Sequence, residues 1–182
     1  MKLQAKMMKL KDGRTAIIRQ AVPDDAEQML TMAKLCATET RNLCSTPEEY
    51  DFPVEAEMKW IIDQNGAGSL LQVAEVGGRL VGNCILHPQG GRRRVRHRCG
   101  IGLSIVKEFW ANGIGTIFMQ NAISVAKDIG YEQMELEVVS TNERAIGLYE
   151  KMGFVPFGLQ PNMFKYEDGS YADVVLMALD LR

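Results

Sequence analysis

The segment Glu108-Phe-Trp-Ala-Asn-Gly-Ile-Gly-Thr-Ile-Phe-Met-Gln-Asn-Ala122 decides the fold, because it joins an apolar strand pattern to an amphipathic helix pattern. Two glycines, Gly113 and Gly115, lie at this junction, although glycine costs roughly 0.5–1 kcal/mol relative to alanine inside a helix. Glycines there let a ligand approach the free backbone N–H groups of the first helical turn, which favour phosphate. The junction therefore predicts either a phosphate-binding turn or close backbone packing.

Two common phosphate motifs do not match this junction. A P-loop needs Gly-Lys-Ser/Thr, whereas Gly115 is followed directly by Thr116. A dinucleotide-binding turn needs glycine or alanine where Phe118 stands, and an acidic residue at the end of the following strand. Glu135 and Glu137 lie within that strand pattern instead. Both motifs are therefore disfavoured.

The composition is that of an ordinary globular protein, and 182 residues suit a single domain, 1–182, with a core over roughly 15–180. The apolar runs are far shorter than the roughly 20 residues of a membrane helix, and the first residues do not resemble a signal peptide. A net charge of −2 disfavours general nucleic-acid binding. Four cysteines without CxxC spacing and two histidines predict reduced thiols and no metal. We expect a cytoplasmic protein with no membrane or nucleic-acid partner.

Hydrophobic periodicity predicts alternating strands and helices along the chain. Gly77-Gly78 predicts a two-residue hairpin turn, and Gly130 and Gly153 predict helix ends. The predicted strands are 15–20, 70–76, 79–86, 95–106, 134–139, 154–159 and 171–179, and the predicted helices begin near 23, 54, 114 and 142. The unit 101–139 predicts two parallel strands joined by a right-handed crossover.

This order of elements, together with EFWANGIGT at 108–116 and LEVVSTNERAIGLYEKMGF at 136–154, resembles the GNAT superfamily of acyl-CoA-dependent N-acyltransferases. Trp110 stands where the family's phosphate loop usually begins with arginine or glutamine. The resemblance implies an α/β (α+β) GNAT fold. Its mixed, mostly antiparallel sheet would have six to seven strands and about four flanking helices, with a splayed central parallel pair.

The resemblance also implies a coenzyme site. Backbone N–H groups of residues 112–116 would hold the pyrophosphate of acetyl-CoA, and the pantetheine arm would lie along the strand ending at Val106. Amides near Ile105 would polarise the thioester carbonyl. Tyr149 would protonate the leaving thiolate, and Asn142 would cap its helix and contact the coenzyme. The implied coenzyme-binding residues are Leu103, Ile105, Val106, Asn112, Gly113, Ile114, Gly115, Thr116, Asn142 and Tyr149.

The sequence leaves the acceptor amine and the general base open. Residues 39–57 are rich in carboxylates, which would attract a cationic amine, although capping boxes account for Glu48 and Glu49. Glu39, Glu48, Glu49 and His97 are candidate bases, and proton loss through water is an equal alternative. Glu39, Glu49 and His97 are also the candidate substrate residues. A small-molecule amine and a protein amine both suit this pattern.

Alternating arginines at 92–98 predict a strand with one charged face, which would be solvated or hold the 3′-phosphate of the coenzyme. The expected function is direct transfer of acetyl from acetyl-CoA to a primary amine within a ternary complex. A non-catalytic acyl-CoA-binding regulatory module is the alternative, and an RNA-contacting protein using the arginines is a third. A homodimer is compatible with the sequence.

Overall fold

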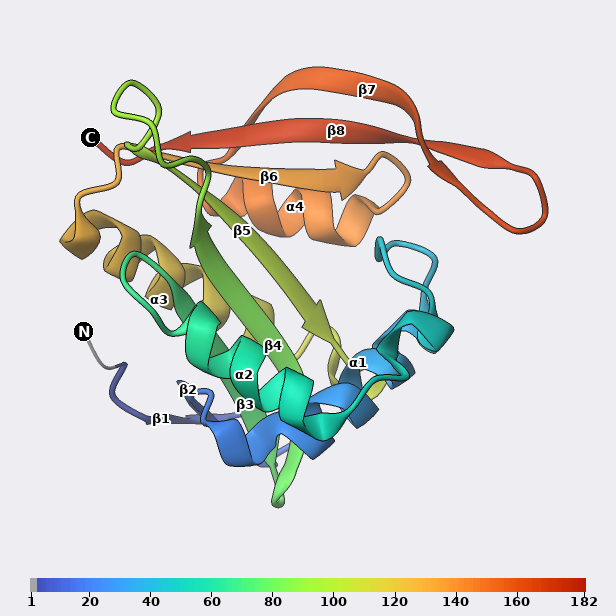
Figure 1. Ribbon diagram of the computed structural model, residues 1–182. Coiled ribbons are helices and arrows are strands. Elements are labelled where there is room, and N and C mark those ends of the chain that lie inside the picture. The colour runs from blue at the N-terminus through green and yellow to red at the C-terminus, as the bar shows by residue number, and fades with distance from the viewer. Residues whose placement is uncertain (1–2) are drawn as a thin grey trace.

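A computed structural model describes residues 3–182, in which one eight-stranded sheet carries helices on both faces (Figure 1). The strands follow the order β1-β2-β3-β4-β5-β6-β8-β7 across the sheet. Their bounds are β1 Lys6–Lys9, β2 Thr15–Gln20, β3 Leu70–Val76, β4 Arg79–Pro88, β5 Arg98–Ile105, β6 Gln133–Val139, β7 Val155–Lys165 and β8 Tyr171–Asp180. The helices are α1 Ala26–Glu39, α2 Val54–Gln64, α3 Ile114–Ile129 and α4 Glu143–Lys151, with 3-10 turns at Pro23–Asp25, Pro47–Tyr50 and Lys107–Phe109.

The centre of the sheet holds its parallel pair, β5 and β6, whereas the other neighbouring strands pair antiparallel. The pair is hydrogen-bonded only at the start of both strands, where Arg98–Gly100 face Gln133–Glu135. Beyond Gly100, β5 stays with β4 as far as Ile105, and β6 stays with β8 as far as Val139. The two half-sheets therefore diverge and leave a wedge-shaped gap. The expected mixed sheet with a splayed central parallel pair is confirmed.

Helix α3 follows the divergent end of β5 and packs its apolar stripe on the sheet. Phe118, Met119 and Ala122 are fully buried. Burying a large apolar side chain contributes about 1.5–3 kcal/mol, so these residues fix the helix firmly. Its N-terminus consequently lies at the edge of the wedge, directly after the turn that carries Gly113.

The sheet has one strand more than the six to seven expected. The additional strand is β1, whose four residues Lys-Met-Met-Lys pair with β2 at the edge of the sheet. It contains no β-branched or aromatic residue, so its local sequence does not favour a strand. Pairing with β2 stabilises β1, and no pattern in the local sequence predicts this pairing.

The arginine-rich segment is a turn rather than the predicted charged strand, because Val95 and Arg96 both donate backbone hydrogen bonds to the Arg92 carbonyl oxygen (2.9 and 3.0 Å). Proline at position 88 has no N–H to extend the ladder of β4, and β5 begins only at Arg98. The segment lies at the opposite end of β5 from Gly113, a strand length of roughly 23 Å. The prediction of a charged strand was therefore wrong, and this position does not support a grip on the coenzyme.

Candidate functional site

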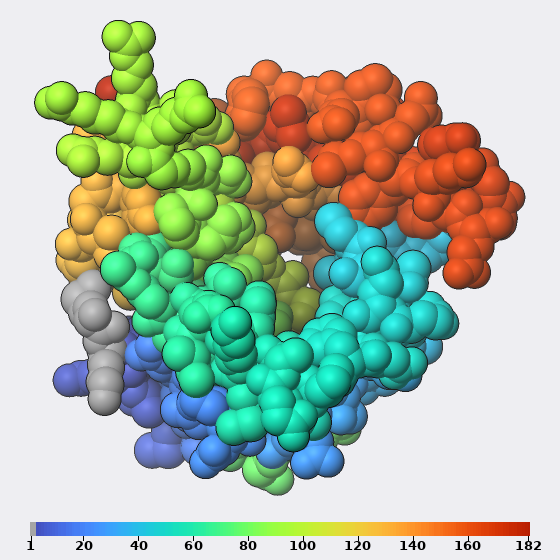
Figure 2. Space-filling view, in the orientation of Figure 1, coloured from blue at the N-terminus to red at the C-terminus, as the bar shows by residue number. Residues whose placement is uncertain are grey.

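A cavity of about 380 Å³ fills the wedge between β5 and β6. Its lining comes from the divergent ends of β5 and β6, the glycine turn before α3, helix α4, and the loop that follows α1. Figure 2 shows a hollow on the face that carries α1 and α2, bounded by the cyan loop after α1 and the orange hairpin of β7 and β8. Segments far apart in the sequence thus meet around one space.

Gly113 is the N-cap of α3 and adopts a left-handed backbone conformation with φ of 92°. This conformation is unfavourable for residues with a Cβ, which accounts for the glycine. No side chain in residues 3–182 caps this helix. The N–H groups of its first turn therefore carry the positive end of the helix dipole without an internal acceptor. Such a helix end is suited to hold an anion.

Gly115 has a different reason to lack a side chain. A Cβ at this position would lie 3.0 Å from Leu148 Cδ2 and 3.6 Å from Ile105 Cδ1. The first distance is shorter than ordinary van der Waals contact. Gly115 therefore lets α3, α4 and β5 approach closely where they line the cavity. Both interpretations of the junction therefore apply. Gly113 leaves backbone N–H donors free for a phosphate, and Gly115 permits close packing.

Backbone groups of β5 face the wedge at alternate residues. The Val106 N–H donates to the Val81 carbonyl oxygen of β4 (2.9 Å), so the groups of neighbouring Ile105 point to the other side. By the same alternation, Leu103 also presents its N–H and carbonyl to the wedge, and both residues line the cavity. Val106 is buried and does not line it.

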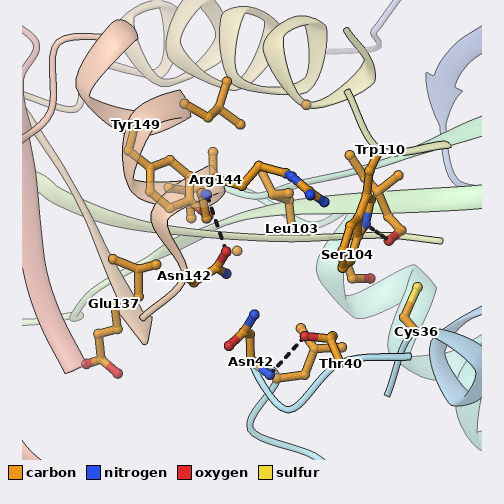
Figure 3. A pocket seen from close by; sticks show the side chains of 18 of the residues that line it. Cys36, Thr40, Asn42, Leu103, Ser104, Trp110, Glu137, Asn142, Arg144 and Tyr149 are labelled. Carbon is orange, nitrogen blue, oxygen red and sulfur yellow. Dashed lines mark hydrogen bonds between the residues drawn. The ribbon is translucent and has the colours of Figure 1, made fainter. Parts of the chain in front are cut away.

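Tyr149 and Asn142 bring α4 to the same cavity (Figure 3). Asn142 caps the helix, because its side-chain oxygen accepts the Ala145 N–H at 3.3 Å. Tyr149 is 8% exposed and its ring packs against Phe154, with the centroids 6.0 Å apart. Burial raises the pKa of the Tyr149 hydroxyl well above the usual value for tyrosine. The hydroxyl therefore keeps its proton at neutral pH.

A model of the Acetyltransferase (GNAT) family matches residues 28–154. The chain belongs to this family. An N-alpha-acetyltransferase from Sulfolobus acidocaldarius is 28% identical over 172 residues, which are 90% of this chain and 92% of that protein. A GNAT acetyltransferase from Streptococcus pneumoniae has a TM-score of 0.85 at 28% identity, covering 91% of this chain and 99% of that one. An acetyltransferase from Salmonella typhimurium, solved with its cofactor acetyl-CoA, shares the fold with a TM-score of 0.81 at 18% identity, covering 92% and 94%.

As a GNAT protein, the chain is an acetyl-CoA-dependent acyltransferase. Its cavity offers a helix end with free N–H donors and a strand edge with unpaired backbone groups, which suit the phosphates and the amide-containing arm of that substrate. Within residues 3–182, no group of His, Cys, Asp and Glu side chains could hold a metal ion. The described helices include none long and apolar enough to cross a membrane.

Trp110, the departure from the family's phosphate loop, is tied into the cavity wall. Its indole Nε1 donates to the Ile105 carbonyl oxygen at 2.6 Å. The Arg144 guanidinium of α4 lies 4.3 Å from the centroid of its ring (Figure 3). Trp110 therefore braces the divergent end of β5 and stacks with a cation from the other side of the wedge. Sequence reasoning did not assign a role to Arg144.

Three of the expected coenzyme residues do not line the cavity: Val106, as described above, and Ile114 and Asn112. Ile114 is buried with 1% exposure, and the Asn112 side-chain amide donates to the Trp110 carbonyl oxygen at 3.3 Å. Thr116 does line the cavity, as do Leu103, Ile105, Gly113, Gly115, Asn142 and Tyr149. The structure thus gathers seven of the expected residues around one space.

The expected substrate residues do not line the cavity. Glu39 Oε2 accepts the Lys107 N–H at 2.6 Å, and Glu49 Oε2 accepts the Thr46 N–H at 2.6 Å. His97 precedes β5, at the far end of that strand from the cavity.

Other carboxylates of the segment 39–57 are paired with a cation or buried. Lys34 Nζ lies 2.5 Å from Asp51 Oδ1, and Glu57 is buried with 7% exposure. Many carboxylates of 39–57 therefore accept backbone hydrogen bonds, form ion pairs or are buried, which leaves fewer of them to attract an amine.

Several residues that sequence reasoning did not select line the cavity. Glu137 of β6 supplies the one carboxylate found in the described lining, and it is exposed (Figure 3). Cys36, Thr40, Asn42 and Cys44 come from α1 and the following loop. The alternation along β6 could have indicated Glu137, because a glutamate in a buried strand needs a polar surrounding. The loop residues carry no such signal.

Proposed function

We propose that this protein is an N-alpha-acetyltransferase, which moves acetyl from acetyl-CoA directly to the α-amino group of a polypeptide. The observation that carries the proposal is the cavity in the wedge, where unpaired backbone donors, Tyr149 and one carboxylate meet. The named activity of the Sulfolobus relative, which aligns along almost the whole chain, supports the α-amino acceptor.

The phosphates of acetyl-CoA would bind at the N-terminus of α3. Gly113 leaves that helix without a side-chain cap, so the N–H groups of Gly115 and Thr116 are free to donate. The pantetheine arm would pair like an additional strand with the wedge-facing groups of Leu103 and the N–H of Ile105, whose carbonyl oxygen already accepts from Trp110 Nε1. The N–H of Ile105 would then stabilise negative charge on the thioester oxygen. Asn142 would contact the arm from α4.

Tyr149 would act as the general acid. When the amine nitrogen bonds to the acyl carbon, the carbon–sulfur bond breaks and the sulfur leaves as a thiolate that needs a proton. Burial keeps the Tyr149 hydroxyl protonated, so it can supply that proton at neutral pH. This position of Tyr149 argues against the alternative of a non-catalytic acyl-CoA-binding module, which has no use for a buried acid beside the wedge.

The cavity favours an α-amine over a lysine side chain. An α-amino group has a pKa near 7.7–8.0 and lysine one near 10.4, so at pH 7.5 about a third of the first and about 0.1% of the second is unprotonated. The described lining contains no histidine, and its one carboxylate is Glu137. A carboxylate acting through water suffices for an amine of which about a third is already neutral. Glu137 would therefore take up the proton that the α-amine loses.

The acceptor would enter through the hollow beside the loop after α1 (Figure 2). A polypeptide N-terminus can reach such a recess from outside, with the rest of its chain on the surface. A cytoplasmic location and a homodimer stay predictions from the sequence.

The experiment compares three acceptors at equal concentration, with release of the coenzyme thiol as the readout. The first is a peptide with a free N-terminus and arginine in place of lysine. The second is the same peptide with a formylated N-terminus and one lysine, and the third is a free amino acid. We expect turnover with the first alone. Equal or faster turnover with either of the others would overturn the α-amino assignment.

A further inference from the structure

Arg41 joins the loop that follows α1 to the tip of the β7–β8 hairpin. Its guanidinium lies 3.8 Å from the centroid of the Tyr166 ring. The Nη2 group lies 2.9 Å from Asp168 Oδ2 and donates to Ser170 Oγ at 3.1 Å. Asp168 also accepts the Ser170 N–H at 2.9 Å, and this hydrogen bond fixes the turn that Arg41 contacts. One side chain thus makes three different contacts across about 130 residues of sequence.

The hairpin tip, residues 164–171, is paired within its own hairpin and has few polar contacts to other segments. Its pairing with the rest of the hairpin is interrupted by a register shift between Gln160 and Phe164. Asn162 lies in this interruption with φ of 52°, a conformation rare outside glycine, and its N–H donates to Asp173 Oδ1 at 2.8 Å. Among the described residues, the hydrogen bonds and ion pairs from the tip to segments outside β7 and β8 all involve Arg41. Arg41 therefore supplies the polar contacts that tie the tip to the part of the described chain outside its own hairpin.

The same loop forms part of the cavity wall. Thr40 has an extended backbone, so the side chains of Thr40 and Arg41 point to opposite sides. Thr40 and Asn42 line the cavity, and the Asn42 N–H donates to Thr40 Oγ1 at 3.2 Å (Figure 3). Arg41, between them, does not line the cavity and reaches the hairpin instead. A movement of Arg41 therefore moves the two cavity residues beside it.

We propose that Arg41 is a positioning residue for the acceptor. By binding the hairpin tip, it holds the loop 40–44 at the width that a polypeptide N-terminus requires, and it acts through Thr40 and Asn42 without touching the substrate. The inference rests on the proposed function, since it concerns the entrance for a peptide. It leaves the coenzyme side of the cavity unchanged.

The Arg41 contacts are exposed, with 56% of each side chain of the Arg41–Asp168 pair accessible. Exposed ion pairs are weak and are screened by salt. We therefore expect Arg41→Ala to raise the KM for the peptide about 5-fold, with the KM for acetyl-CoA and the thermal midpoint unchanged. Arg182→Ala is the matched control, because Arg182 makes a comparable exposed pair with Asp180 at 2.8 Å away from the cavity.

Hydrogen exchange supplies a readout that does not depend on turnover. In Arg41→Ala, amides of 164–171 and of 40–44 should exchange several-fold faster, and Arg182→Ala should leave both unchanged. Adding Asp168→Ala to Arg41→Ala should change little more, because both residues serve one contact.

An unchanged peptide KM, or unchanged exchange in either segment, would overturn the positioning role. A failure of the proposed function is distinguishable, because it would appear as no peptide turnover by the unaltered enzyme while the exchange result still stands.

Discussion

The inner wall of the cavity, residues 101–116 and 142–149, consists of strand edge and helix ends anchored in the core, with Phe118, Met134 and Ile114 buried nearby. The outer wall is the loop 40–44, and one exposed arginine ties it to the hairpin tip 164–171, which does not itself line the cavity. The first wall is fixed by backbone geometry and apolar burial, and the second by a few polar contacts at the surface. This difference matches the needs of a constant co-substrate and a variable acceptor.

The largest expected effect concerns the inner wall. Tyr149→Phe removes the proposed acid and should lower kcat about 100-fold, with a much smaller rise in the KM for acetyl-CoA. Because burial raises the Tyr149 pKa, its proton stays in place as the pH rises to about 10, so activity should not fall below that pH through Tyr149 ionisation. Steady-state kinetics over pH 6–10 check both expectations.

The control for this substitution is Tyr131→Phe. Tyr131 is equally buried and its hydroxyl donates to the Gly68 carbonyl oxygen at 2.8 Å, outside the cavity lining. It should lose stability and keep kcat. An unchanged kcat in Tyr149→Phe would remove the acid role.

The second prediction separates backbone strain from ligand binding. Gly113→Ala and Gly130→Ala both place a Cβ at positive φ, 92° and 95°, at opposite ends of α3. Each should cost about 1–2 kcal/mol of stability. Gly113→Ala should also raise the KM for acetyl-CoA about 10-fold, because the strained turn shifts the free N–H groups, whereas Gly130→Ala should not. Denaturant unfolding and kinetics on both variants check this, and equal KM values would contradict a phosphate site at Gly113.

The third prediction tests the proton acceptor. Glu137→Gln keeps the size of the side chain and removes its ability to take a proton. We expect kcat/KM for a peptide to fall about 10-fold at pH 7. The loss should shrink above pH 8, because more of the α-amine is then neutral without assistance.

Glu143→Gln makes the same charge change at the exposed start of α4, outside the cavity lining, and should leave the pH profile unaltered. A loss for Glu137→Gln that stays constant with pH would show that Glu137 does not accept the proton.

The smallest expected effect concerns Trp110. Trp110→Phe removes the indole hydrogen bond to the Ile105 carbonyl oxygen and should raise the KM for acetyl-CoA about 5-fold. The chain has two tryptophans, so Trp60→Phe leaves Trp110 as the sole fluorophore of that kind. Its emission should change on titration with acetyl-CoA, whereas the emission of Trp110→Phe should not. The opposite pattern would place the ligand away from Trp110.

The inner wall could be predicted largely from the sequence, because its signals are local. Gly113, Asn142 and Tyr149 lie at helix ends or on helix faces whose positions follow from short-range periodicity. The structure places all three in the cavity lining. Ile114 and Asn112 lie within the same turn but face the core or the turn itself. A sequence motif therefore predicts where a turn lies better than it predicts which of its side chains face the cavity.

The outer wall could not be predicted, because its contacts join distant segments. Nothing near Arg41 indicates Asp168 or Tyr166 as its partners. Glu39 and Glu49 were selected for charge, yet both cap backbone N–H groups. Strand β1 was missed for the same reason, since it exists through pairing with β2. Charge and composition indicate which contacts a segment is able to make, and the tertiary structure determines which of them form.

Hydrogen exchange with and without saturating acetyl-CoA tests most directly whether the two walls have separate tasks. Amides that bind the coenzyme should exchange more slowly, so we predict protection at 103–105 and at 113–117, with no change at 164–171. A thermal midpoint raised by a few degrees should accompany it, since ligand at 100 times its Kd adds about 2.7 kcal/mol. Protection confined to the loop 40–44 and the hairpin tip, or none in the glycine turn, would contradict the account.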